Sequence, residues 1–336
     1  MKRAKATAIA PAPLVEPLNP ARLVEADLLS VEAKLSRLLD SREQLISEIC
    51  HYLVDGGGKR LRPVFILLVY RACGGAEETV GDAVDASIAL ELIHSATLLH
   101  DDIIDGGTLR RGKPSAYTRF GLGPTMVAGD YLFCRAFELC GRFEEHLVRT
   151  AAGACIQLTE GEVMEGRMRH NEAVSVKDYM AVIGRKTASL FAAGGRVAAD
   201  LAQVPDRTAS AMEELGNSIG LAFQMIDDVL DILGPEEKIG KPVGSDLRAG
   251  TPSLPVVLGL ETEPELRRLF GNGRELNGAA FKRALQILRS PRLLDRARAM
   301  AAEQVKTAHQ MLAMLKPSVY RDSLGVLINE QIDREV

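Results

Sequence analysis

The sequence contains no tryptophan, and only 4% of its residues are aromatic. Surfaces that stack nucleic-acid bases need aromatic side chains, so this composition argues against such a surface. A surplus of positive charge is also missing, because the formal net charge is −4 at pH 7. A phosphate backbone would therefore find no electrostatic support. We expect no nucleic-acid partner.

Cysteine is present, but without the spacing of a metal site. None of the five cysteines forms a CxxC pair, and several lie in apolar runs, where a free thiol packs as a small hydrophobe. This pattern predicts reduced core cysteines in a cytoplasmic protein. No apolar run reaches transmembrane length. The basic residues Lys2, Arg3 and Lys5 are not followed by the apolar stretch of a secretory signal.

Strand-like alternation is scarce, whereas helical spacing extends over almost the whole chain. Apolar residues recur at intervals of three and four, as at Leu23, Ala26 and Leu29. Two stretches, residues 86–99 and 218–233, are apolar around most of the helix and so belong in the centre of a bundle. The fold class is therefore predicted to be all-α.

The domain organisation is simple. Residues 1–20 contain four prolines and are predicted to form a flexible N-terminal tail. Residues 21–336 show no short-period repeat and are predicted to form one helical domain.

The two apolar stretches end in matching acidic groups. Each carries three aspartates spaced i, i+1 and i+4, followed closely by the glycine expected after a helix. These positions fall within an arc of about 100°, so each group is expected to project from one face. We call them the first acidic box (Asp101, Asp102 and Asp105) and the second acidic box (Asp227, Asp228 and Asp231).

Such boxes are unfavourable without a partner. Like charges at i and i+4 repel by roughly 0.2–0.5 kcal/mol, and an exposed carboxylate at a helix C-terminus opposes the macrodipole by about 0.3–1 kcal/mol. A hard dication removes both conflicts, and Mg²⁺ prefers carboxylate, water and phosphate oxygens. A solvated helix end is the alternative for either box alone. Their repetition on two central helices favours Mg²⁺ as the cofactor.

A basic segment shows the opposite arrangement. In GGGKRLRP (56–63), Pro63 suits the first position of a helix that runs to about Ala72. Lys59, Arg60 and Arg62 would then crowd a helix N-terminus, where the dipole is already positive. Glycines, free N–H groups and arginine forks together make a phosphate site. A solvated basic loop is the alternative.

More cations accompany the boxes, as expected for a metal-bridged polyphosphate whose outer oxygens bind Lys and Arg. They are Arg110, Arg111 and Lys113 after the first box, and Lys186, next to Thr187, at a predicted helix start.

One histidine shares a face with the first box. His94 precedes Asp101 by seven residues, about two helical turns, and is predicted to point to the same side. A satisfied structural role is the alternative for this residue. No Ser-His-Asp or Cys-His arrangement has suggestive spacing, so covalent catalysis is not supported.

Together these motifs resemble those of the trans-polyprenyl diphosphate synthases, most of all the bacterial heptaprenyl- and octaprenyl-type members. The resemblance covers about residues 21–335 and implies a prenyltransferase, built as a single large helical bundle of the isoprenoid synthase type with a central cavity. The matching segments occur in the family's order. They are GGGKRLRP (56–63), ELIHSATLLHDDIIDGGTLRRGKPS (91–115), GDYLF (129–133), GRKTASLF (184–191), FQMIDDVLD (223–231) and GKPVGSDLRAG (240–250).

The resemblance also implies roles for matching residues. All six aspartates of the two boxes would hold Mg²⁺ ions on an allylic diphosphate, such as farnesyl or geranyl diphosphate. The implied ligands of isopentenyl diphosphate are Lys59, Arg62, His94 and Arg111. The implied contacts of the allylic diphosphate are Arg110, Lys186, Thr187, Gln224 and Lys241. The implied catalytic set is Asp101, Asp102, Asp105, Asp227, Asp228 and Lys186.

One position departs from the family's pattern. Many members carry Lys after the glycine that stands here as Gly250, whereas this chain has Thr251. The departure puts one diphosphate contact in question, but not the reaction.

Product length is expected to depend on the residues before the first box. In the family, bulky residues there block the growing chain; here Ala96 and Thr97 are small and lie about 6–7.5 Å before Asp101 along a helix. This favours a hexaprenyl to decaprenyl product, of the kind used for quinone side chains. Phe133 and Phe137 are candidate floor residues of the tunnel, with ordinary core packing as the alternative. Geranylgeranyl or farnesyl diphosphate synthesis is the alternative product class.

Two other classes of protein share some of these features. A terpene cyclase would usually replace the second box and would lack GGGKRLRP. A non-catalytic partner subunit would typically have damaged boxes, whereas both are intact here. The chain is therefore expected to be catalytic, either as the homodimer that the resemblance implies or with a partner chain of a different sequence.

Overall fold

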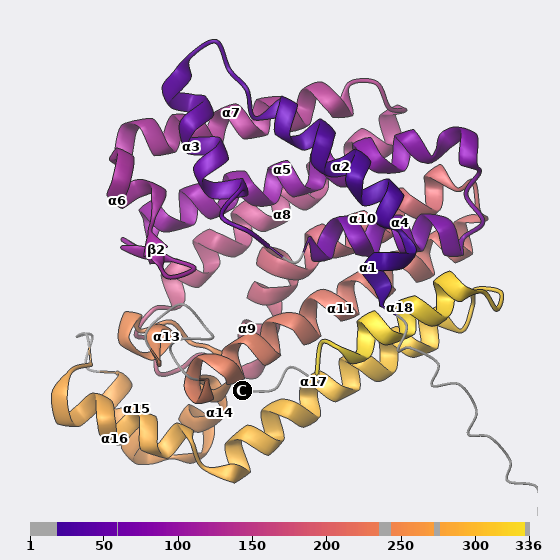
Figure 1. The fold of residues 1–336 in the computed structure, drawn as a ribbon. Helices are drawn as coiled ribbons and strands as arrows, with labels where there is room; N and C mark the ends of the chain where they lie inside the picture. The colour runs from indigo at the N-terminus through magenta and orange to yellow at the C-terminus, as the bar shows by residue number, and fades with distance from the viewer. Residues whose placement is uncertain (1–18, 59, 235–242, 272–275, 333–336) are drawn as a thin grey trace, which may run out of the picture.

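A computed structural model describes residues 19–58, 60–234, 243–271 and 276–332 of the protein. Within these ranges the regular structure is almost entirely helical, which confirms the predicted all-α class (Figure 1). The first elements are α1 (Pro20–Leu23), α2 (Glu25–Leu38), α3 (Gln44–Val54), α4 (Leu61–Ala72), η1 (Glu77–Thr79), α5 (Val80–Ile104), α6 (Ala116–Phe120), α7 (Leu122–Cys140) and α8 (Glu145–Met168).

The remaining helices carry the second acidic box and surround it. They are α9 (Val176–Ile183), η2 (Gly184–Ala188), α10 (Ser189–Leu201), α11 (Asp206–Leu233), α13 (Ser245–Ala249), α14 (Leu254–Thr262), α15 (Pro264–Phe270), α16 (Gly278–Leu288), α17 (Pro291–Leu312) and α18 (Val319–Asn329). The described strands, β1 (Leu109–Arg110) and β2 (Lys113–Pro114), pair antiparallel as a short hairpin.

Two long helices form the centre of the bundle, as their apolar sequences predict. Helix α5 is flanked by α7 on one side and by α4 and α10 on another, and α11 lies between α10 and α17 (Figure 1). Most residues of α5 from Ala83 to Leu99 are buried, whichever face they lie on. Both ends of α5 are partly exposed, including the C-terminal end, which carries the first acidic box.

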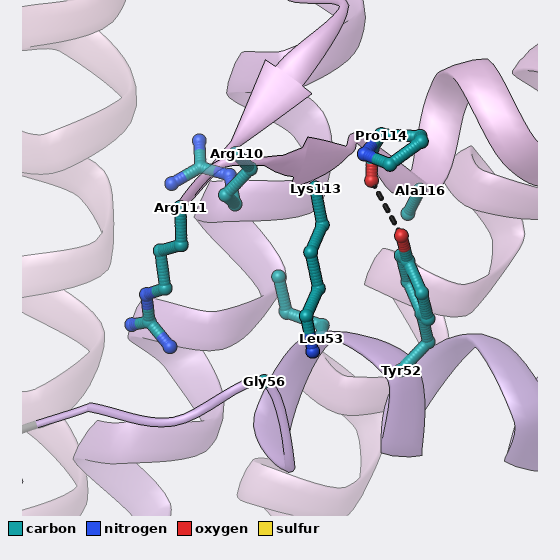
Figure 2. Close-up of a pocket in the computed structure, with 8 residues that line it drawn as sticks. All are labelled: Tyr52, Leu53, Gly56, Arg110, Arg111, Lys113, Pro114 and Ala116. Atoms are coloured by element: carbon teal, nitrogen blue, oxygen red, sulfur yellow. Dashed lines mark hydrogen bonds between the residues drawn. The ribbon is translucent and has the colours of Figure 1, made fainter. Parts of the chain in front are cut away.

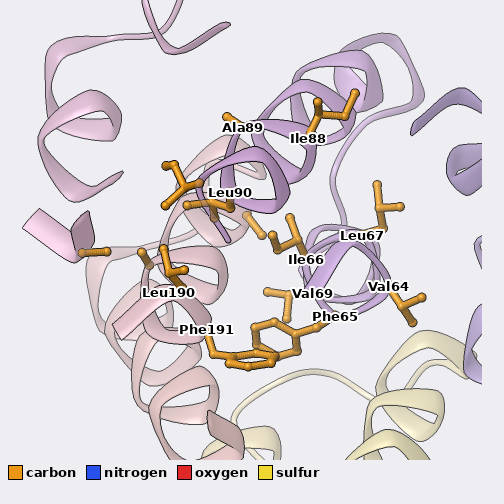
Figure 3. Packing of buried hydrophobic residues seen from close by; sticks show 14 of the residues in the cluster. Val64, Phe65, Ile66, Leu67, Val69, Ile88, Ala89, Leu90, Leu190 and Phe191 are labelled. Atoms are coloured by element: carbon orange, nitrogen blue, oxygen red, sulfur yellow. The ribbon is translucent and has the colours of Figure 1, made fainter. Parts of the chain in front are cut away.

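The core between α4, α5 and α10 is tightly packed (Figure 3). Ile66, Leu90 and Phe191 are each at most 2% exposed. A Cβ atom added to Gly194 would lie 2.9 Å from Ile66 Cγ1, so the small residue allows α10 to approach α4 closely. This rigid contact fixes the helices that bear the functional residues.

A second hydrophobic cluster fills the C-terminal region. It combines apolar residues of α9, α11 and α14 to α17, including Met225, Val257 and Leu294. Helix α11 contributes to both clusters, since Met212 and Leu215 belong to the first one. The predicted single domain over residues 21–336 accords with this shared helix and stays a prediction. Most of the predicted tail lies outside the described residues, and its last residue, Pro20, already begins α1, capped by the Asn19 side chain.

Two helix boundaries differ from the sequence prediction. Helix α4 begins at Leu61 rather than Pro63, because Arg60 takes up a left-handed backbone (φ +46°) and turns the chain into the helix. The segment with Lys186 does not start a helix. It forms a π-helical turn, η2, that continues α9 directly into α10. Such wide turns place extra side chains on one face and are frequent at functional sites.

The cysteines are all free thiols, but the prediction that they lie in the core is only partly confirmed. Cys50 and Cys140 are buried, Cys73 and Cys155 are partly buried, and Cys134 is exposed on α7. None of the helices described has both the length and the apolar character needed to cross a bilayer.

Candidate active site

A large cavity lies between the two acidic boxes. Its volume is about 940 Å³, and its walls come from α4, α5, α8, α9, η2, α10, α11 and the segment after Gly244. The site residues predicted from the sequence that line it are Arg62, His94, Thr97, Asp101, Asp105, Arg110, Arg111, Lys186, Thr187, Gln224, Asp227, Asp228 and Asp231. Lys59 and Lys241 lie outside the described residues. The cavity therefore brings together motifs that are far apart in the sequence.

The first acidic box does not present one common face. Asp101 and Asp105 line the cavity, as residues four apart on a helix should. Asp102 does not line it; the side chain is buried and accepts three hydrogen bonds of 2.8–3.0 Å from Arg110 Nε and Nη2. The expected common projection is wrong for Asp102, because its carboxylate binds the Arg110 guanidinium and does not line the cavity.

The two cavity-facing aspartates have different surroundings. Partial burial raises the pKa of Asp101 to about 7, although the nearby ammonium of Lys186 acts in the opposite direction. Asp105 is exposed and forms an ion pair with Arg169, at the end of α8. Asp101 therefore bears a charge that the protein alone stabilises poorly, as expected of a group that binds a cation.

All three aspartates of the second box line the cavity, as their spacing predicts, but they differ in exposure and in hydrogen-bond partners. Asp227 lines the cavity and is partly exposed. Asp228 is 3% exposed and accepts hydrogen bonds from Tyr179 Oη (2.8 Å), the Leu254 amide (2.8 Å) and Gln224 Nε2 (2.9 Å). Burial nevertheless raises the pKa of Asp228 to about 7.

Asp231 acts as a cap for the segment that follows. Its carboxylate accepts hydrogen bonds from the Ser245 amide and hydroxyl and from the Asp246 amide, at 2.7–3.3 Å. Its carbonyl oxygen accepts one from the Gly244 amide at 2.8 Å. These bonds satisfy amide groups at the start of α13, which an intrahelical partner cannot reach. They also hold Ser245 and Asp246, which line the cavity, against α11.

Arg62 supplies positive charge from α4. Its guanidinium lies 4.7 Å above the Phe191 ring, and its Nε is buried without a hydrogen-bond partner among the described residues. Burial lowers the pKa of Arg62, with Glu91 and Asp227 acting in the opposite direction. A buried donor of this kind is costly unless a ligand satisfies it.

His94, which lies on α5, is close to Arg62 of α4. Burial lowers the pKa of His94 well below its usual value, and the guanidinium groups of Arg62, Arg110 and Arg111 lower it further. His94 and Asp101 both line the cavity, so the predicted shared face is confirmed. A neutral imidazole in this position can donate one hydrogen bond and accept another.

The hairpin after the first box carries two more cations toward the glycine-rich loop. Figure 2 shows the side chains of Arg111 and Lys113 extending from the hairpin toward Gly56. A Cβ atom on Gly58 would lie 3.2 Å from a terminal nitrogen of Arg111, so the Arg111 guanidinium packs closely against the glycine-rich loop. The Tyr52 hydroxyl donates to the Pro114 carbonyl at 2.7 Å and fixes the hairpin against α3 (Figure 2). Burial and the neighbouring Arg110 lower the pKa of Arg111.

Lys186 projects from the π-helical turn toward the first box. Its ammonium lies 2.6 Å from Glu162 and 2.5 Å from Glu165, both on α8. Burial alone would lower the pKa of Lys186, but Glu165, Asp101 and Glu162 outweigh it and raise the pKa. Next to it, Thr187 donates a hydrogen bond of 2.9 Å to Gln224 and so links the turn to the second box.

Relatives of known class match almost the whole chain. The family model for polyprenyl synthetase matches residues 43–288. The chain belongs to the polyprenyl synthetase family. It is a prenyltransferase of the trans-polyprenyl diphosphate synthase class, as the sequence motifs predict.

Individual relatives differ in the product that their names give. A short chain isoprenyl diphosphate synthase from Methanothermobacter thermautotrophicus is 34% identical over 328 residues, which cover 92% of this chain and 99% of the relative. An octaprenyl diphosphate synthase from Escherichia coli is 33% identical over 322 residues, with 93% and 97% covered. The crystal structure of a polyprenyl synthase from Caulobacter crescentus, complexed with calcium and isoprenyl diphosphate, has a TM-score of 0.89 and 34% identity, with 94% and 97% covered.

The predicted chain-length residues of the synthetase are not all placed at the cavity. Thr97 lines it, whereas Ala96 is fully buried within the bundle and does not. Phe133 and Phe137 both lie on α7. The Phe133 ring packs between the rings of Phe137 and of His100, which is on α5, and neither phenylalanine lines the cavity. Phe137 is 51% exposed, which does not accord with ordinary core packing, and its role as a floor residue stays a prediction.

Sequence reasoning missed three residues of the synthetase's cavity region. Glu162 and Glu165 on α8 hold Lys186, and Tyr179 on α9 holds Asp228. The glutamates carry a weak signal, since they lie three residues apart and thus on one helix face. Tyr179 carries none, because its partner is 49 residues away.

Proposed function

We propose that this prenyltransferase condenses isopentenyl diphosphate head-to-tail with an allylic diphosphate in a Mg²⁺-dependent reaction. One observation carries the proposal: carboxylates of both boxes and the cations of three separate segments line one cavity of about 940 Å³. Acidic groups suit metal ions, and Lys and Arg suit the outer oxygens of the diphosphates that those ions bridge.

The residues present fit Mg²⁺ bound together with a substrate. Within the described ranges, no three acidic, histidine or cysteine side chains lie close enough to enclose a metal ion by themselves. Mg²⁺ typically takes one or two carboxylates and completes its shell with water and phosphate oxygens. Asp101, Asp105 and Asp227 are the proposed direct ligands, because they line the cavity and are partly or fully exposed. Asp102, Asp228 and Asp231 are proposed to complete the boxes while bonded to protein donors.

The cationic and polar residues of the cavity are proposed to form two subsites, one for each diphosphate substrate. Arg62, His94 and Arg111, together with Lys59, are proposed to bind isopentenyl diphosphate. Lys186, Thr187 and Gln224 are proposed to contact the allylic diphosphate, as are Arg110 and Lys241. The Caulobacter relative was solved with calcium and isoprenyl diphosphate, which supports a divalent metal and a prenyl diphosphate as ligands here.

The reaction then follows from charge and exclusion of water. When bound, Mg²⁺ supplies Lewis-acid stabilisation of the departing diphosphate. Lys186 and the arginines offset the negative charge that develops as the allylic C–O bond breaks. The apolar wall, which includes Leu98, Leu158 and Leu190, excludes the water that would quench the allylic cation. The double bond of isopentenyl diphosphate attacks the allylic carbon and forms the new C–C bond. The resulting cation then loses a proton from the adjacent carbon to the released diphosphate, which restores a double bond.

The proposed product is a hexaprenyl to decaprenyl diphosphate, of the kind used for quinone side chains. The small Thr97 at the cavity wall supports a long product, because it leaves room along α5. Geranylgeranyl or farnesyl diphosphate is the alternative. A geranylgeranyl diphosphate synthase from Methanosarcina mazei is as similar, at 33% identity, as the octaprenyl relative.

Two further properties complete the proposal. Large apolar side chains are exposed on the successive helices α7 and α8, and they support a homodimer, since exposed apolar surface commonly marks an interface. They are Leu122, Met126, Val127, Phe137, Ile156 and Val163. The five free cysteines accord with a cytoplasmic location.

The decisive experiment uses the purified chain alone. It is incubated with isopentenyl diphosphate and farnesyl diphosphate, with and without Mg²⁺, and the extracted products are chromatographed. A ladder that ends in one long polyprenyl diphosphate, absent without Mg²⁺, is the expected result. A single-step geranylgeranyl product would overturn the proposed length alone. No product with any allylic primer, even with a candidate partner chain added, would overturn the proposed reaction.

A further inference from the structure

Tyr179 is a buried side chain of the cavity wall that the proposed reaction does not use. It lies on α9, is 3% exposed, and donates its hydroxyl hydrogen to Asp228 Oδ2 at 2.8 Å. The ring belongs to the second hydrophobic cluster, so the phenol cannot turn away without leaving a gap.

Asp228 is surrounded by donors from three elements. Oδ2 also accepts from the backbone amide of Leu254, the first residue of α14, at 2.8 Å. Oδ1 accepts from Gln224, one turn earlier on α11, at 2.9 Å. Both oxygens are thus held by protein, and the carboxylate plane has little freedom to rotate. Tyr179 supplies the one bond of this set that comes from α9.

The neighbouring Asp231, three residues later and on the same face of α11, has a corresponding function for another segment. It binds Ser245 and Asp246 at the start of α13, while Asp228 binds the start of α14. The segment between these anchor points includes Thr251 and Ser253, which line the cavity. The second box therefore organises its own surroundings as well as facing the cavity.

We propose that Tyr179 is a positioning residue of the second acidic box, which fixes Asp228 and thereby aligns Asp227 and the cavity wall for binding a metal–diphosphate complex. This inference rests on the proposed function. Partners that orient metal-binding groups typically change metal affinity by about 10–100-fold when they are removed. Tyr179→Phe removes only the hydroxyl and keeps the packed ring.

The test measures metal binding without turnover. Mn²⁺ is titrated into the full chain with a thiolo analogue of farnesyl diphosphate, and free Mn²⁺ is measured by electron paramagnetic resonance. Tyr179→Phe should raise the Kd for Mn²⁺ about 10-fold. In a separate steady-state assay, the Michaelis constant for isopentenyl diphosphate should stay unchanged. Tyr131→Phe is the matched control, because the Tyr131 hydroxyl, on α7, donates to the Asp40 carbonyl and does not line the cavity. It should leave both constants unchanged.

A double-substitution comparison distinguishes the positioning of Asp228 by Tyr179 from a purely structural role of Tyr179. In an Asp228→Ala background the acceptor is gone, so adding Tyr179→Phe should change the Mn²⁺ affinity no further. Additive effects of the two substitutions would overturn the proposal. So would a Tyr179→Phe variant with normal Mn²⁺ affinity, whether turnover is normal or reduced. Absence of prenyl transfer by the wild-type chain would instead refute the proposed function, which the binding measurement does not require.

Discussion

At the scale of single residues, the first two aspartates differ in their surroundings in the same way in both acidic boxes. In each box the first aspartate is partly exposed at the cavity, and the second is buried. Protein donors hold the buried carboxylates: Arg110 binds Asp102, and Tyr179, Gln224 and the Leu254 amide bind Asp228. Helical spacing predicted which helix ends carry charge. It could not predict the division, because the donors come from elements that are adjacent only after folding.

This division predicts different consequences for Asp102 and Asp105. Asp102→Ala leaves Arg110 partly buried without its carboxylate, and losing one partner of a buried ion pair costs about 3–5 kcal/mol. Asp105→Ala removes an exposed carboxylate and should leave the free energy of unfolding within about 1 kcal/mol of the wild type. Both should reduce turnover, Asp105→Ala by more than about 100-fold through weaker charge stabilisation.

Urea unfolding and steady-state kinetics of the two variants check this contrast. Equal losses of stability would show that Asp102 and Asp105 have equivalent surroundings, contrary to the structure. Asp82→Ala, which removes another aspartate of α5 paired with an arginine, is a control whose turnover should not change.

The raised pKa of Asp101 makes stability depend on pH in the metal-free protein. Its ordinary value is 3.8, and burial raises it to about 7. Between these values the folded chain holds a proton that the unfolded chain has lost. The free energy of unfolding should therefore fall as pH rises through this window, and the loss should be complete above about pH 7. Asp101→Asn should weaken this dependence, although Asp228, with a pKa also raised to about 7, should preserve part of it.

Urea unfolding in a chelator between pH 5 and pH 8 measures the effect. Mg²⁺ with diphosphate should restore more stability at pH 8 than at pH 5, because metal binds the ionised carboxylates. An Asp101→Asn variant with the wild-type pH dependence would contradict the assignment to Asp101.

At the scale of helices, glycines set how closely the functional elements approach. A Cβ atom on Gly216 of α11 would lie 2.1 Å from the Phe191 carbonyl oxygen of α10. Since that neighbour is backbone, Gly216→Ala must push the two helices apart. Helix α11 carries Asp227, and α10 directly follows the turn that contains Lys186. Both stability and turnover should therefore fall, and the free energy of unfolding should drop by about 1–3 kcal/mol.

Gly153→Ala is the matched control, because nothing lies within 4 Å of its added Cβ. In the interior of α8 this change should stabilise the protein by about 0.5–1 kcal/mol. Thermal unfolding and product assays of both variants test the point. Sequence alone could not separate these two glycines, since each lies within a helical pattern and only the packed neighbour distinguishes them.

The length of the product should respond to α5 at Thr97. Thr97→Phe places a bulky ring in the cavity wall and should shift the product to shorter chains, with little change in the rate of the first condensation. Phe137→Ala, on the exposed side of α7, should leave the chain length unchanged. Chromatography of the extracted products decides both outcomes, and a longer product from Phe137→Ala would support its role as a floor residue.

At the scale of the whole molecule, the sequence predicted more of the fold than of its assembly. The all-α class and the central position of α5 and α11 follow from apolar residues on every face of those helices. The start of α4 did not follow, because it depends on Arg60 in a left-handed conformation, held by Glu32 and Glu91. Non-glycine residues adopt that conformation only when tertiary contacts compensate for it.

The exposed apolar residues of α7 and α8 lead to the prediction about assembly. Ile156 and Val163 are each 60% exposed and lie two turns apart on one face of α8. If this face is buried in a homodimer, Ile156→Asp with Val163→Asp should place four charges in the interface and shift the protein to monomers. Leu29→Asp is the control, since Leu29 is equally apolar and 66% exposed but lies on α2. Sedimentation analysis at matched concentrations distinguishes the double variant from the control.

Two outcomes would contradict this prediction. A dimer that survives the double substitution would place the interface on another surface. A wild-type monomer with full activity would show that activity does not need a dimer, in keeping with a described cavity that is lined by a single chain.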